Sequence, residues 1–233
     1  MVPDGSKEGQ GANGVAVLYS GGLDSAVLLA HAAARGEAQP IYISVGLAWE
    51  EQERAAAERA VRLMPVANRI RPMVSLSLDM RDVYPPTHWA IRGEAPAFDT
   101  PDEDVYLDGR NIALLSKAAV FMARARIERV LMGTLAGNPF PDATPAFFRA
   151  MEAALGAGLA TTIEIDAPFL SLHKADVIRL GVSLNAPLEA TLSCMQPRDG
   201  LHCGRCSKCR ERRDAFREAG VRDETRYAAV PPR

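Results

Sequence analysis

The chain has 233 residues, 48% of them hydrophobic, and its 27 Lys and Arg nearly balance its 29 Asp and Glu. This size and composition favour one packed α/β domain with a small appendage. The net charge of −2 argues against a generally basic nucleic-acid-binding surface. The sequence also lacks an apolar run of about 18 residues, the length of a membrane span. We therefore expect a cytoplasmic protein without a membrane partner, with a disordered polar tail over residues 1–14.

The first predicted strand, Val15–Leu18, runs directly into a glycine-rich turn and then into a helix. The turn reads Ser20-Gly21-Gly22-Leu23-Asp24-Ser25. Two glycines allow the backbone to approach a ligand closely, and the helix start offers free N–H groups to a phosphate. A carboxylate beside phosphates needs a bridging cation, so Asp24 indicates either Mg²⁺ or a helix cap. The alternative is an ordinary strand-to-helix turn.

Further strands and helices alternate along the chain. Apolar runs predict strands at residues 41–45, 73–78, 130–133 and 162–165, and helices at 50–64, 112–125, 145–155 and 174–184. This order predicts a doubly wound parallel sheet of five strands in a domain over residues 15–186. Ligands of such sheets bind beyond the carboxyl ends of the strands. We therefore expect the Ser20 loop and the loop 134–144 to face one crevice.

Three other features indicate ligand contacts. The segment 84–104, with four prolines, is long and irregular, which favours a substrate loop over a plain surface excursion. Arg110 and Asn111 stand at a helix start, where they could address a carboxylate, phosphate or purine edge. Alternatively, Asn111 is an N-cap and Arg110 a solvated charge. Lys174 opposes the dipole at its helix start, so it indicates a bound phosphate or a tolerated exposed lysine.

All four cysteines lie near the C-terminus with the spacing C-x8-C-x2-C-x2-C, at Cys194, Cys203, Cys206 and Cys209. Four thiolates in a short segment suit a closed, structural Zn²⁺ site, although an Fe–S cluster could use the same residues. We assign residues 187–220 to a zinc-binding helical segment and 221–233 to a C-terminal tail. The basic residues around it lack interleaved aromatics, which disfavours a nucleic-acid partner.

The Ser20 loop resembles that of the PP-loop ATP pyrophosphatases. Together with Gly109-Arg110-Asn111, the Lys174 helix and the cysteine segment, it makes the chain similar to the QueC (ExsB) family of 7-cyano-7-deazaguanine synthases. The resemblance implies an adenine nucleotide alpha hydrolase-like fold, a dimer, and a ligase that converts 7-carboxy-7-deazaguanine and ammonia to the nitrile through an acyl-adenylate and an amide. It implies catalytic roles for Asp24, Lys174 and Arg110, substrate contacts for Arg110, Asn111 and Asp142, and zinc on the four cysteines. The ATP site would comprise Tyr19, Ser20, Gly21, Gly22, Leu23, Asp24, Ser25, Ala26 and Val27.

Two crevice loops depart from the family pattern. The chain has Gly46-Leu47-Ala48-Trp49-Glu50-Glu51 and Phe140-Pro141-Asp142-Ala143-Thr144 where typical members have Tyr-Gly-Gln-Arg-His and Tyr-Pro-Asp-Cys-Arg type strings. A related ligase that couples the activated acid to another amine, or stops at the amide, is therefore an alternative. A tRNA sulfurtransferase and a non-catalytic zinc-binding adaptor are further alternatives.

Overall fold

A five-stranded parallel sheet forms the centre of the molecule. The computed structural model describes residues 14–229; residues 1–13 of the expected tail and residues 230–233 lie outside this description. The strands are β1 (Val15–Leu18), β2 (Ala38–Ser44), β3 (Val74–Ser77), β4 (Arg129–Leu131) and β5 (Glu164–Asp166). They lie in the order β3-β2-β1-β4-β5, and each neighbouring pair is parallel. The predicted five-stranded parallel sheet is thus confirmed.

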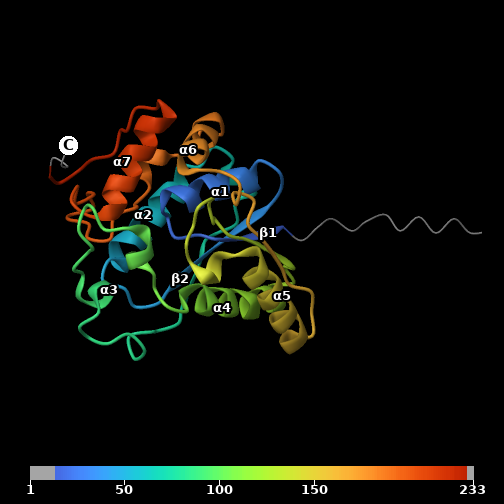
Figure 1. Ribbon diagram of the computed structural model, residues 1–233. Coiled ribbons are helices and arrows are strands. Elements are labelled where there is room, and N and C mark those ends of the chain that lie inside the picture. The colour runs from blue at the N-terminus through green and yellow to red at the C-terminus, as the bar shows by residue number, and fades with distance from the viewer. Residues whose placement is uncertain (1–13, 230–233) are drawn as a thin grey trace, which may run out of the picture.

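Helices cover both faces of the sheet, as expected for a doubly wound fold (Figure 1). Successive residues of a strand point to opposite faces, so Ala16 packs in the cluster that includes Leu115 and Phe148, and Val17 in the cluster that includes Leu28 and Ile178. The first cluster belongs to α4 (Arg110–Ala125) and α5 (Pro145–Leu159). The second belongs to α1 (Leu23–Ala33), α6 (Lys174–Ser183) and α7 (Ser207–Ala219). The remaining helices are α2 (Glu50–Arg62) and α3 (Trp89–Arg92), with short 3₁₀ turns η1 (Ala67–Arg69), η2 (Asp102–Val105), η3 (Pro141–Ala143) and η4 (Leu188–Ala190).

β2 begins three residues earlier than its apolar run predicts. Pro40 lies inside it and pairs with Val17 of β1, whereas β3 starts to pair only at Ile41. A proline cannot donate to a neighbouring strand. Gln39 Nε2 instead donates to the Pro72 carbonyl at 2.8 Å, so a side chain supplies a donor beside the proline. Proline therefore does not end this strand.

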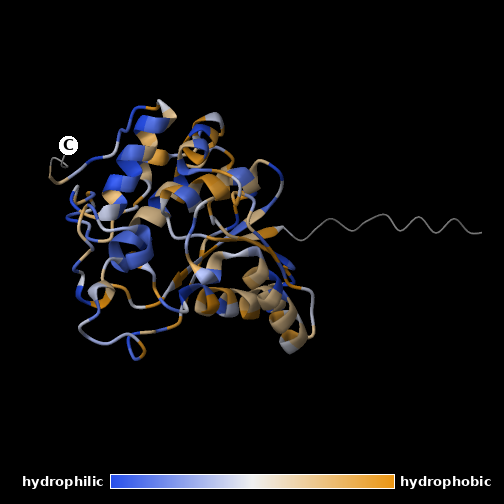
Figure 2. Ribbon diagram, in the orientation of Figure 1, coloured by the Kyte–Doolittle hydropathy of each residue, from blue (hydrophilic) through white to orange (hydrophobic). Residues whose placement is uncertain are grey.

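The cysteine segment packs on the irregular loop that precedes α4. Gln196 donates to the Gly93 carbonyl at 2.9 Å, and Arg210 to the Thr100 carbonyl at 3.1 Å. Beyond the hydrophilic helix α7 (Figure 2), the chain returns to this segment, where His202 N donates to the Arg226 carbonyl at 3.1 Å. The structure thus joins segments 93–100, 196–210 and 226 in one layer at the carboxyl ends of the strands. Among the helices of residues 14–229, none has the length and apolar character of a membrane span.

Candidate functional site

The turn between β1 and α1 is held in one shape by glycine and by two serines. Gly21 has φ +77°, and a Cβ there would lie 2.7 Å from the Ala57 Cα of α2, so only glycine fits. Ser25 Oγ donates to the Gly22 carbonyl at 3.0 Å, and Gly22 N donates to Ser20 Oγ at 3.2 Å. The loop therefore presents the N-terminus of α1, with the positive end of its dipole, to the crevice.

The sequence-predicted nucleotide residues divide into those that face the crevice and those that support it. A first cavity of about 310 Å³ is lined by Tyr19, Ser20, Gly22, Asp24 and Ser25, and Leu23 lines the adjoining second cavity. Ala26 and Val27 are fully buried in the face of α1 that packs on the sheet. With Gly21 against α2, these two residues hold the loop from behind.

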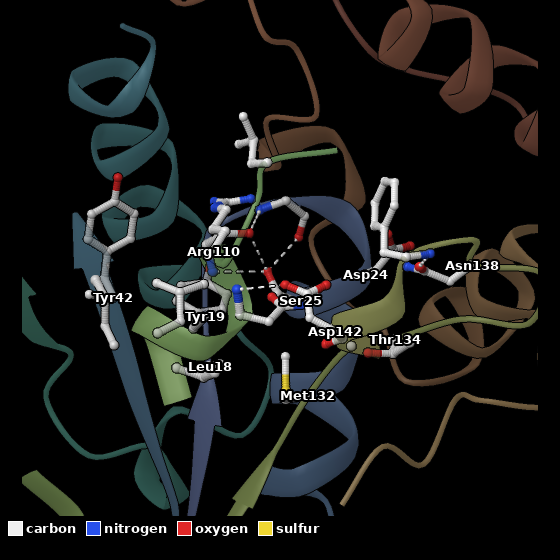
Figure 3. A pocket seen from close by; sticks show the side chains of 18 of the residues that line it. Leu18, Tyr19, Asp24, Ser25, Tyr42, Arg110, Met132, Thr134, Asn138 and Asp142 are labelled. Atoms are coloured by element: carbon white, nitrogen blue, oxygen red, sulfur yellow. Dashed lines mark hydrogen bonds between the residues drawn. The ribbon is translucent and has the colours of Figure 1, made fainter. Parts of the chain in front are cut away.

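The first cavity lies at the point where the strand order reverses between β1 and β4. As expected, the Ser20 loop and the loop after β4 face the same space, and Thr134, Asn138 and Asp142 line it (Figure 3). Ligands of open parallel sheets bind at such a point. The guanidinium of Arg110 is also part of its wall, and Arg110 Nε is buried without a hydrogen-bond partner. An acceptor on a ligand would satisfy this donor.

Asn111 and Asp142 are paired with each other. Asn111 N donates to Asp142 Oδ2 at 3.1 Å, and Asn111 Nδ2 donates to the Asp142 carbonyl at 3.0 Å. Burial raises the pKa of the Asp142 carboxyl, although the bonds from Asn111 oppose this effect. The helix begins at Arg110 with Gly109 as its N-cap, so the interpretation of Asn111 as the N-cap is wrong. Asp142 thus orders the start of α4, the helix that carries Arg110.

A second cavity of about 620 Å³ contains a cluster of charges. Lys174 Nζ lies 3.0 Å from Asp24 Oδ2 and also pairs with Glu211, while Lys208 lies 2.7 Å from the other oxygen of Glu211. Burial alone would lower the pKa of Lys174, but Asp24 and Glu211 raise it well above its usual range. Burial likewise opposes ionisation of Glu211, yet the two lysines lower its pKa to about 2. Lys174 is therefore neither exposed nor alone at its helix start.

Asp24 keeps one oxygen for a ligand. Its Oδ2 contacts Lys174, but its Oδ1 is buried without a hydrogen-bond partner. A buried carboxylate oxygen usually has a donor or a cation beside it. The position at the start of α1, inside both cavities, suits a cation that bridges to phosphate oxygens.

Sequence reasoning missed Glu53 of the crevice wall, and it placed Trp49 and Trp89 in ligand loops without singling out either side chain. Trp49 and Trp89 stack with ring centroids 5.7 Å apart and an interplanar angle of 7°, and both line the second cavity. Glu53 lines both cavities and is 9% exposed. Glu53 could have been found from the sequence, because it lies at helical spacing from Ala57 and Ala60 on the apolar face of the predicted helix, which is buried in the structure. An acid within an apolar stripe is a functional candidate.

The four cysteines converge as their spacing predicts. All four Sγ atoms lie within 4.8 Å of one another, and the Cys206–Cys209 and Cys203–Cys209 distances are 3.5 and 3.9 Å. Sulfurs at the corners of a tetrahedron with metal–sulfur bonds of ~2.3 Å would be about 3.8 Å apart. Cys203 N donates to Cys194 Sγ at 3.2 Å, and Arg205 N to Cys203 Sγ at 3.3 Å, as suits thiolates. This cluster can hold a tetrahedral metal ion.

The chain is similar to several known proteins. The chain is 37% identical over 222 residues to a 7-cyano-7-deazaguanine synthase of Anaeromyxobacter dehalogenans (strain 2CP-C), covering 91% of this chain and 94% of the relative. It is 33% identical over 227 residues to a 7-cyano-7-deazaguanine synthase of Thermoplasma volcanium, covering 92% and 91%. Among solved structures, an NMN synthetase from Francisella tularensis aligns with 91% of this chain and 79% of its own, at 16% identity and a TM-score of 0.43.

The family model described as queuosine biosynthesis protein QueC matches residues 14–220. This range includes the Ser20 loop, Arg110, Lys174 and all four cysteines. The match therefore covers both the crevice and the cysteine cluster, and the chain belongs to the QueC family.

Proposed function

We propose that this protein is an ATP-dependent ligase that converts 7-carboxy-7-deazaguanine to 7-cyano-7-deazaguanine. A carboxylate oxygen attacks the α phosphorus of ATP, which releases pyrophosphate and leaves an acyl-adenylate. Ammonia displaces AMP to give the amide. A second ATP then adenylates the amide oxygen, which releases pyrophosphate and one amide proton, and loss of AMP with the remaining N–H proton gives the nitrile. Family membership and the names of the relatives support the overall conversion.

The observation that carries the proposal is that the Ser20 loop lines both cavities. Backbone N–H groups at the start of α1 would bind the departing pyrophosphate. Lys174 and the Arg110 guanidinium would offset negative charge that develops on the phosphates. Mg²⁺, when bound, would screen the phosphates, and Asp24 Oδ1 is the oxygen available to it. The nucleotide would occupy the first cavity and the acid the second.

The cysteine cluster has a structural part in this proposal. Four protein thiolates complete a tetrahedron, so a Zn²⁺ ion there has no open position for substrate. The chain has four cysteines, and all four belong to the cluster. A sulfurtransferase needs a cysteine free to carry sulfur, which the cluster would not provide.

The test is to incubate the purified protein with 7-carboxy-7-deazaguanine, ATP, Mg²⁺ and an ammonium salt, and to follow AMP and the deazapurine products by mass spectrometry. We expect amide and then nitrile, with AMP formed at each step. Asp24→Asn should reduce AMP formation by 10²-fold or more, on the order of an electrostatic catalytic group, with an unchanged circular dichroism spectrum. Asp82→Asn, a change at an exposed acid, should behave as the parent. AMP release without amide or nitrile would instead favour a ligase for another amine, which the altered loop at Trp49 would accommodate.

A further inference from the structure

Glu53 lies where the two cavities meet. It projects from the first turns of α2, below the carboxyl end of β2, and it lines both spaces together with Ser20, Asp24 and Arg110. If the nucleotide occupies the first cavity and the acid the second, the bond between the acyl group and AMP forms and breaks at this boundary. Glu53 is therefore placed beside the chemistry.

In the described part of the chain, the carboxyl group of Glu53 is held by hydrogen bonds and not by an ion pair. Tyr42 of β2 donates its hydroxyl to Glu53 Oε2 at 3.1 Å, and the Trp49 side chain is a further donor. Glu50 of the same helix repels it, but Glu50 is engaged by Ser44 and by the N–H groups of Val45 and Gly46. Within residues 14–229 Glu53 has no ion pair, and Arg110 acts on it only through longer-range attraction. Burial is the largest effect and raises the pKa of Glu53 to about 7.

Three other acids of the crevice are committed elsewhere. Asp24 pairs with Lys174, Glu211 lies between Lys174 and Lys208, and Asp142 accepts from Asn111. A carboxylate held by a lysine is a weak base because its charged form is stabilised. A carboxyl group that titrates near neutral pH suits proton transfer best. Among these crevice acids, Glu53 has that property.

We propose that Glu53 is the general base of the carbon–nitrogen bond-forming and nitrile-forming steps. This inference rests on the proposed function. In the first step, the nitrogen of ammonia bonds to the acyl carbon, the bond from that carbon to the AMP oxygen breaks with its electron pair leaving on AMP, and a nitrogen proton passes to Glu53. In the second, one amide N–H proton is lost to solvent as the amide oxygen is adenylated. Glu53 then takes the remaining N–H proton as the C≡N bond forms and the bond from that carbon to the AMP oxygen breaks with its electron pair leaving on AMP. Solvent removes the proton from Glu53 between steps.

The experiment separates adenylation from proton transfer. Glu53→Gln keeps the shape of the side chain and an acceptor for the Tyr42 hydroxyl, so acid-dependent exchange of pyrophosphate into ATP should stay within about twofold of the parent. Amide formation in a single turnover should fall about 10²-fold or more, the usual contribution of a general base. Glu58→Gln, at an exposed acid of the same helix, is the matched control and should retain both activities. Normal amide formation by Glu53→Gln, or a raised KM for the acid with unchanged kcat, would overturn the proposal. Absence of exchange in the parent would instead contradict the proposed function.

A pH profile gives a second, independent readout. At a fixed concentration of free ammonia, the parent rate should rise with pH through about 7 as Glu53 loses its proton. Tyr42→Phe removes a donor that favours the charged carboxylate, so the midpoint of this rise should move to higher pH. Glu53→Gln should abolish the rise. A midpoint that is unchanged or lowered in Tyr42→Phe, or a rise that persists in Glu53→Gln, would exclude Glu53 as the base.

Discussion

At the scale of single residues, Arg212 is the largest fully buried side chain of residues 14–229, with 0% exposure. Its guanidinium donates to the Leu188 carbonyl at 2.7 Å and to the hydroxyls of Thr191 and Thr225 at 2.9 and 2.7 Å. It also lies over the Phe216 ring, 5.1 Å from its centroid. Burial lowers the pKa of Arg212, and these acceptors compensate for the loss of water. One arginine thus joins η4, α7 and the segment after α7.

We expect Arg212→Met to be strongly destabilising. The methionine fills part of the volume but leaves buried acceptors without a donor, which costs on the order of 3 kcal/mol. Urea unfolding of zinc-loaded protein measures the change. Arg217→Met is the control on the same helix, because Arg217 is 76% exposed and its pair with Asp214 contributes well below about 1 kcal/mol. Equal stability of the two variants would show that the buried hydrogen bonds of Arg212 do not stabilise the fold.

The residue scale also shows what the sequence alone could reveal. The loop Ser20–Ser25 and the cysteine cluster were predicted because each depends on local spacing. The partners of Lys174 were not, because Glu211 is 37 residues away and α6 meets α7 only after the chain has folded. The partners of Glu53 were not predicted either, because Tyr42 and Arg110 come from two other elements. Long-range charge pairs leave no spacing signal, so the sequence indicated the Ser20 loop and Lys174 but not the charge pairs that surround them.

At the scale of elements, the parallel sheet follows from alternating strands and helices, but the ends of the elements are less predictable. α5 continues to Leu159, past Gly156 and Gly158, because Phe148, Met151 and Leu155 pack it on the core. Tertiary burial here outweighs the low helix propensity of glycine. Segment 84–104 was predicted to be irregular, and the structure adds that α3 and η2 lie against the cysteine segment.

The contact between α6 and α7 supports a prediction about pH. The folded protein lowers the pKa of Glu211 from 4.5 to about 2, so the ion pairs of Glu211 contribute stability that is fully present above about pH 4.5. This contribution is lost as the pH falls toward 2, because Glu211 then takes up a proton. The stability difference between parent and Glu211→Gln should therefore be constant from pH 7 to 5 and shrink between pH 4.5 and 3 in urea unfolding. Glu218→Gln, at an exposed acid of the same helix, should show no such dependence. A difference that grows in acid would contradict the assigned pairing.

At the scale of the whole molecule, the cysteine segment connects the α/β sheet to the loop that covers the second cavity. Its residues contact the loop at Gly93, Thr100 and Asp102, through Gln196, Arg210 and Lys208. Trp89 and Ala90 of the loop are packed against the α/β domain, whereas the stretch from Gly93 to Pro101 forms no helix or strand. A metal ion on the cysteines would therefore act at a distance, by fixing the wall of the second cavity. Its loss should affect the cavity before the sheet.

Removal of the metal tests this connection. Treatment with a zinc chelator, or Cys206→Ser, should increase amide hydrogen exchange in residues 89–105 and 194–213. β1, β2 and α1 should stay protected, since they share a core around Leu28 and Ile178 that contains no cysteine. Structural zinc contributes several kcal/mol of folding free energy, on the order of 10 in small zinc peptides, so the melting temperature should also fall. Added Zn²⁺ should restore protection in the chelated parent but not in Cys206→Ser. If residues 194–213 lose protection while residues 89–105 keep it, the cysteine segment does not order the loop, and the acceptor cavity is formed by the α/β domain alone.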